Sequence, residues 1–155
     1  PMPPPALIER QEGNNAHTHP FVSVYEAYKK SGPNVLGVEA LQGDDGSTGV
    51  KVNTADGYAD YLFTATDMQA HHPSKRVSFC GRLGLIREKE GQIQLMYLGC
   101  GRSLKKGNFV LESDHDVYAA IYMQHGVWYY SATGPVRVKI GKETKKLNEG
   151  YNQKL

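Results

Sequence analysis

The chain has 155 residues, with 18 basic and 16 acidic side chains and a formal net charge of +2. An excess this small, scattered along the chain, does not give the concentrated basic surface of a nucleic-acid-binding protein. No apolar run approaches the roughly 18 residues that a membrane span requires. We therefore expect one domain with its own core, and neither a nucleic acid nor a membrane as partner.

The chain begins with a proline-rich stretch and no initiator methionine. Residues 1–5 predict an extended linker, and this beginning is typical of a processed or excised piece. Residues 6–12 form a possible first strand. Residues 21–28 alternate in the way of a strand with two different faces.

His17 and His19 lie in the polar loop between these two segments. Two histidines at i and i+2 can share a metal ion. No third ligand stands at a diagnostic spacing, so they are weak metal candidates, and solvent-facing loop histidines are the alternative. We expect no cofactor.

The middle of the chain predicts three more strands, at 35–41, 50–53 and 58–64, separated by Gly- and Asp-rich turns. A polar loop then covers 68–75 and carries His71 and His72. Adjacent residues of an extended segment point to opposite sides, so these two rarely bind one metal.

The block from 76 to 130 consists of short β-patterned runs joined by turn residues, and no helix of ordinary length fits inside it. This excludes enzyme folds built around a βαβ unit. The spacing predicts an all-β fold, an antiparallel two-sheet β-sandwich of jelly-roll-like form with about eleven or twelve strands. The expected strands of this block are 76–80, 82–88, 92–99, 109–113, 117–123 and 127–131.

A last strand is predicted at 136–140, where Val136, Val138 and Ile140 point inward. The β-sandwich domain therefore covers residues 6–141. Residues 142–155 are polar and predict a C-terminal tail that crosses to a partner or frays.

Isolated glycines and two cysteines stand within the β-block. Gly99 and Gly101, in a strand context, predict a bulge or a close approach of two backbones. Cys80 and Cys100 are interpreted as two free, packed thiols, with one cross-strand disulfide as the alternative.

Tyrosine is unusually frequent, with 10 residues against 4 Phe and 1 Trp. Alternation places Trp128 and Tyr130 on one face of their strand and Tyr129 on the other. One face must enter the core, and the other could stack on sugar rings. The weak substrate-binding candidates are Trp128 and Tyr130 with Arg82 and Arg87, and Arg102 and Lys105 are further possible partners for acidic sugars.

Asp114, His115 and Asp116 follow one another at a turn into a strand. Flanking carboxylates can orient a histidine for base catalysis, but Asp also fills turns for structural reasons. We assign no catalytic residue.

Three segments resemble a known family. They are HPFVSVYEAY at 19–28, YADYLF at 58–63, and FCGRLGLIRE at 79–88, which runs on through LMYLG at 95–99 to Ser103 and Leu104. Each is similar to a strand of the β-region of bacterial heparinase II/III-like polysaccharide lyases. These are strand patterns and not catalytic signatures.

The resemblance implies an accessory C-terminal β-sandwich domain of a secreted or periplasmic lyase. In that family the catalytic Tyr and His residues come mainly from a helical toroid and the sheet domain nearest it. The implied partners are therefore a missing N-terminal catalytic domain and an acidic polysaccharide. The isolated chain is then no enzyme. The alternatives are an independent carbohydrate-binding module and a stand-alone enzyme that uses His17, His19 or His115.

Overall fold

A computed structural model describes residue 24, residue 26, residues 32–42 and residues 47–155. The strands expected at 6–12 and 21–28, and the histidines at 17 and 19, lie outside these residues. The described part contains eleven strands and no helix, so it offers no helical segment that could span a membrane.

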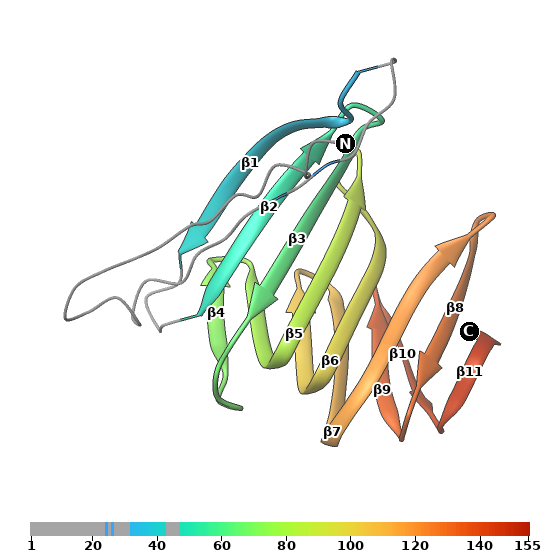
Figure 1. Cartoon of the computed structure of the whole chain (residues 1–155). Helices are drawn as coiled ribbons and strands as arrows, with labels where there is room; N and C mark the ends of the chain where they lie inside the picture. The colour runs from blue at the N-terminus through green and yellow to red at the C-terminus, as the bar shows by residue number, and fades with distance from the viewer. Residues whose placement is uncertain (1–23, 25, 27–31, 43–46) are drawn as a thin grey trace, which may run out of the picture.

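The strands differ widely in length (Figure 1). In chain order they are β1 (Val35–Gln42), β2 (Thr48–Thr54), β3 (Tyr58–Thr64), β4 (His71–Ser74), β5 (Val77–Lys89), β6 (Gln92–Lys106), β7 (Phe109–Gln124), β8 (Val127–Ala132), β9 (Val136–Ile140), β10 (Glu143–Leu147) and β11 (Gly150–Lys154).

Two predicted strands, β3 and β9, have the bounds read from the sequence. Others are longer than predicted, because adjacent runs join without a turn: 76–80 with 82–88, and 109–113 with 117–123. The predicted loop at 68–75 contains the short strand β4.

The C-terminal segment, predicted from the sequence to be a polar tail, has a different structure. Residues 142–155 form β10, which pairs with β9, and β11, which pairs with β8. The physical reason is that two exposed edge strands offer unpaired backbone groups to this polar segment, and ladder hydrogen bonds need no apolar side chains.

All eleven described strands belong to one antiparallel sheet, so the two separate sheets expected from the sequence are not shown. The main path runs β1-β2-β3-β5-β6-β7-β8-β11, while β4 pairs with β5 and β9 joins β7 to β10. The all-β antiparallel character of the prediction is confirmed.

The long strands bend where glycines of β5 and β6 meet. Gly81 pairs with Gly101, and the β6–β7 register shifts on both sides of Gly101. A β-carbon on Gly101 would lie 2.5 Å from Leu98 Cδ1 and 2.7 Å from the carbonyl oxygen of Cys80. Only glycine allows this approach, so the predicted bulge is confirmed. Figure 1 shows β5, β6 and β7 curving at one end of the molecule.

The bend divides the sheet into two arms. The large arm comprises β1, β2, β3, β8 and β11 with residues 83–89, 92–98 and 117–124 of the long strands. The small arm comprises β4, β9 and β10 with residues 77–80, 103–106 and 109–112.

The small arm lies over one face of the large arm. Phe79 in the first half of β5 covers the second half of the same strand, since a β-carbon on Gly84 would be 3.1 Å from its ring. Phe109 packs against Trp128 with ring centroids 5.9 Å apart. The space between the arms is the apolar core, whose fully buried members include Phe63, Phe79, Ile86, Met96, Leu98, Leu104, Leu111 and Ile121.

An ion pair joins the two arms at one side of this core. Lys106 Nζ of the small arm lies 3.0 Å from Glu88 Oε2 of the large arm, and both side chains are mostly buried. The same ammonium lies 3.4 Å from the centroid of the Tyr61 ring. Burial, the most important cause, together with the charge and hydrogen bond of Glu88, raises the pKa of Tyr61 to about 12.

Candidate basic polysaccharide site

The outer face of the small arm gathers cations from three strands. Strand alternation turns Val136 and Val138 inward, so Arg137 and Lys139 of β9 point outward. The ladder sets Lys146 of β10 opposite Arg137, and Glu112 of β7 on its other side. We call the outward set Lys105, Glu112, Arg137, Lys139 and Lys146 the basic face.

Glu112 is the carboxylate at the centre of the basic face, and it is shared. Its Oε1 accepts from Arg137 Nε at 2.6 Å, and its Oε2 lies 3.0 Å from Lys105 Nζ. One carboxylate cannot neutralise two cations, so the trio keeps a net positive charge. Such exposed pairs contribute little to stability, which leaves these side chains free to exchange partners.

Arg137 and Lys146 are like charges in directly opposite register positions. This arrangement is unfavourable in an antiparallel pair. Lys146 forms no ion pair with another described residue, while Arg137 has only its share of Glu112. An anion bound between the two would relieve their repulsion.

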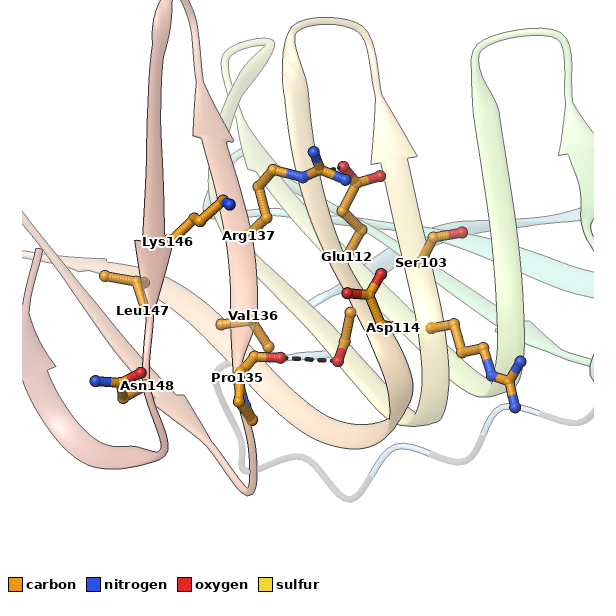
Figure 2. A pocket seen from close by; sticks show the side chains of 11 residues that line it. Ser103, Glu112, Asp114, Pro135, Val136, Arg137, Lys146, Leu147 and Asn148 are labelled. Carbon is orange, nitrogen blue, oxygen red and sulfur yellow. Dashed lines mark hydrogen bonds and ion pairs between the residues drawn. The ribbon is translucent and has the colours of Figure 1, made fainter.

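A shallow cavity of about 430 Å³ lies beside this pair. Figure 2 shows Arg137 and Lys146 on neighbouring strands among the residues that line it, with Glu112 beside Arg137. The remaining lining residues are Arg102, Ser103, Ser113, Pro135, Val136, Leu147 and Asn148. Three cations against two carboxylates, with hydroxyl and amide groups between them, suit an anionic and hydroxyl-rich ligand.

Three hydrogen bonds hold residues in and beside the cavity lining. Ser113 Oγ donates to the Pro135 carbonyl at 2.8 Å (Figure 2) and accepts from the His115 N–H at 3.3 Å. Arg102 Nε donates to Asp116 Oδ1 at 2.7 Å, and this bond raises the pKa of the guanidinium. Asp116 is thus held by Arg102, and in the described part of the chain neither Asp114 nor Asp116 forms a hydrogen bond with His115.

The predicted arginines Arg82 and Arg87 lie away from this cavity. Arg82 Nη1 donates to the Thr66 carbonyl near the bend. Arg87 forms a bidentate, hydrogen-bonded ion pair with Asp60 of β3, and both N–O distances are 2.7 Å. That hydrogen bond is the main cause that raises the pKa of Arg87. Of the two further cations named from the sequence, Arg102 lines the cavity and Lys105 belongs to the basic face.

The aromatic cluster of β8 divides between the two faces as alternation predicts. Trp128 and Tyr130 point inward: Trp128 packs on Phe109, and Tyr130 is buried. Tyr129 points outward and stacks on Tyr122, with ring centroids 6.0 Å apart. The structure therefore does not bring Trp128 and Tyr130 together with Arg82 and Arg87 on one surface.

The described histidines make no common site. His71 is buried and its Nε2 lies 2.8 Å from Asp67 Oδ1, while His115 is exposed. Among the described residues no group of three metal-ligating side chains comes together. Both thiols are free, and Cys80 Sγ donates to the Met68 carbonyl at 2.9 Å.

Arg137 and Lys146 were not named as binding candidates from the sequence, although Val136, Val138 and Ile140 were expected to point inward, which left the residues between them to point outward. The signal was present: two strands separated by a tight turn at Gly141 carry outward cations that a hairpin would place side by side. Because residues 142–155 were predicted to be a tail, β10 was not among the predicted strands.

Comparison with known proteins gives a consistent result. The family model "Endo-acting ulvan lyase C-terminal domain" matches residues 35–123. A stretch of 118 residues is 33% identical to the endo-acting ulvan lyase of Formosa agariphila. It covers 72% of this chain but only 14% of that enzyme's length. No solved structure matches the chain.

Proposed function

This chain belongs to the family of C-terminal domains of endo-acting ulvan lyases, and from that premise we propose that it is an accessory domain that holds acidic polysaccharide for a catalytic domain located elsewhere in a larger lyase. The observation that carries the proposal is the basic face, where Arg137 and Lys146 oppose each other beside the open cavity. The ligand proposed is ulvan.

Several features of the chain support an accessory role over a catalytic one. The matched stretch of this chain covers only 14% of the length of the Formosa agariphila lyase, which leaves ample room for a catalytic domain in that enzyme. Among the described residues that line the cavity beside the basic face there is no histidine or tyrosine to abstract a proton next to a sugar carboxylate. An independent carbohydrate-binding module is the second candidate, and the basic cavity would serve it equally.

The finer architecture is part of the same proposal. The strand patterns at 19–28, 58–63 and 79–88 support a place beside a helical toroid, as in heparinase II/III-like lyases, with the folded sheet acting as a β-sandwich. A secreted or periplasmic location fits a polymeric substrate, which does not cross a cell membrane.

The test is binding of the 155-residue chain to uncleaved ulvan at low ionic strength. The double variant Arg137→Gln/Lys146→Gln should bind about tenfold more weakly, because it loses two charge-assisted contacts. The matched control is Arg137→Gln/Lys145→Gln, which removes the same net charge and is compared with Arg137→Gln/Lys146→Gln. Lys145 lies on the same strand as Lys146 but lines a cavity between the arms.

Two results would contradict the proposal. Equal loss from Lys145→Gln and Lys146→Gln would mean that net charge and not the basic face governs binding. Release of unsaturated uronate from ulvan by the isolated chain, followed by absorbance, would mean that it carries a reaction centre of its own.

A further inference from the structure

A second hollow lies on the opposite outer surface, on the large arm. It has a volume of about 660 Å³, and Tyr97 of β6, Tyr118 of β7 and Tyr151 of β11 contribute its aromatic surface. The ladder pairs Tyr97 with Ala120 and Ala120 with Ser131, so small side chains lie between the rings. We call these five residues the tyrosine groove.

Two of these rings are unusually open to solvent. Tyr118 is 54% exposed and Tyr151 is 84% exposed, although both stand in strands. The third ring, Tyr97, lies beside Gly99, where an added β-carbon would be 3.1 Å from Tyr97 Cε1. Packing of the core does not explain why these aromatic rings are exposed together, because the sheet already buries ample apolar surface.

The backbone under the exposed rings is fixed by hydrogen bonds. The Tyr118 N–H donates to Thr133 Oγ1, and the Thr133 N–H donates to the Tyr118 carbonyl, both at 3.0 Å. Next to Tyr151, the Asn152 N–H donates to Ser131 Oγ at 2.9 Å. The rings therefore project from rigid positions, and a ligand that stacks on them pays only for two side-chain torsions each.

The charge of the groove is opposite to that of the basic face. Among the described residues that line it there is no cation, and Glu149 is the one carboxylate. A sugar that carries a carboxylate would meet a like charge there without a partner. The other lining groups, Ser131 and Thr133 among them, are hydroxyls that suit the hydroxyl groups of an uncharged ring.

We propose that the tyrosine groove is a binding site for uncharged pyranose units of a polysaccharide, which stack their C–H faces on Tyr118 and Tyr151. The rings provide the amphipathic surface, Ala120 and Ser131 leave room for the sugar, and Glu149 excludes acidic units. The proposal rests on the proposed function only for the identity of the polysaccharide, ulvan.

Ionic strength separates this site from the basic face. At about 1 M salt the Debye length falls to about 3 Å, so exposed charge–charge contacts with ulvan are screened while ring stacking persists. We expect the chain to retain a salt-resistant part of its ulvan binding. Tyr118→Ala and Tyr151→Ala should each weaken that part by about three- to tenfold, the scale of one aromatic contact.

Two variants serve as controls. Tyr118→Phe keeps the ring and should keep the salt-resistant binding, whereas Arg137→Gln/Lys146→Gln should weaken binding only at about 0.1 M salt, where the Debye length is about 10 Å. Folding of each variant is checked by its unfolding midpoint, and alanine at an exposed tyrosine should leave that midpoint nearly unchanged.

The outcomes for the two sites are distinguishable. Absence of salt-resistant binding, or equal high-salt affinity in Tyr118→Ala, Tyr151→Ala and the native chain, would overturn the tyrosine groove and leave the basic face standing. Salt-resistant binding that the tyrosine variants lose, together with no effect of Arg137→Gln/Lys146→Gln at low salt, would support the groove and contradict the basic face.

Discussion

The basic face and the tyrosine groove share two strands, β6 and β7, but differ in their chemistry. Strand β7 gives Glu112 to the first and Tyr118 to the second, while β6 gives Lys105 to the first and Tyr97 to the second. Because the bend folds the arms face to face, their outer surfaces point in opposite directions. One pair of strands thus supplies a charged surface and an aromatic surface separated by a core.

This difference depends on the bend, so the largest effect is expected from a change of Gly101. Gly101→Ala places a methyl group against Leu98 and the Cys80 carbonyl. We expect the free energy of unfolding to fall by about 3 kcal/mol, since backbone atoms cannot move aside. Urea unfolding measures the loss. The control Gly37→Ala meets no atom within 4 Å and should change stability by no more than about 1 kcal/mol.

The ion pair between the arms gives the next effect. Glu88→Gln leaves the mostly buried Lys106 without its counter-charge. We expect a loss of about 2–3 kcal/mol, close to the range for breaking a buried pair. The comparison is Glu39→Gln at the more exposed Lys51–Glu39 pair, where the Glu39 side chain is 64% exposed and the atoms are 3.8 Å apart; the expected loss is below about 1 kcal/mol. Equal losses would show that the arms are not held by this contact.

Trp128 tests the assignment of inner and outer faces. Trp128→Leu removes ring contacts with Phe109, and we expect a stability loss of about 1–2 kcal/mol. Because the ring points inward, ulvan affinity should not change, and ulvan should not alter the fluorescence of this single tryptophan. Quenching by ulvan would instead support the prediction, made from the sequence, that Trp128 contacts substrate.

The smallest effect concerns pH. Since the pKa of Tyr61 is raised from 10.0 to about 12, the folded chain binds this proton more tightly than the unfolded chain. The resulting stability is present in full below pH 10 and is lost as pH rises through 12. Unfolding midpoints across that window should fall less steeply in Tyr61→Phe. An unchanged slope would contradict the raised pKa.

Much of the local structure could be predicted. Period-two patterns marked β3 and β9 at their bounds, and alternation separated Trp128 and Tyr130 from Tyr129. The side of the sheet that becomes core could not be predicted, because both sides of β8 carry aromatic rings. The candidate site was therefore sought at Trp128 and Tyr130, whereas the open rings are Tyr118 and Tyr151.

The sequence by itself determined an antiparallel all-β chain, the turns between its strands and the bulge at the glycines, because these follow from local sterics and side-chain alternation. Only the tertiary structure decided that one sheet folds over on itself, that residues 142–155 complete its edges, and which faces remain outside. The physical reason is that strand pairing and burial depend on contacts between residues far apart in the chain, and no local pattern contains them.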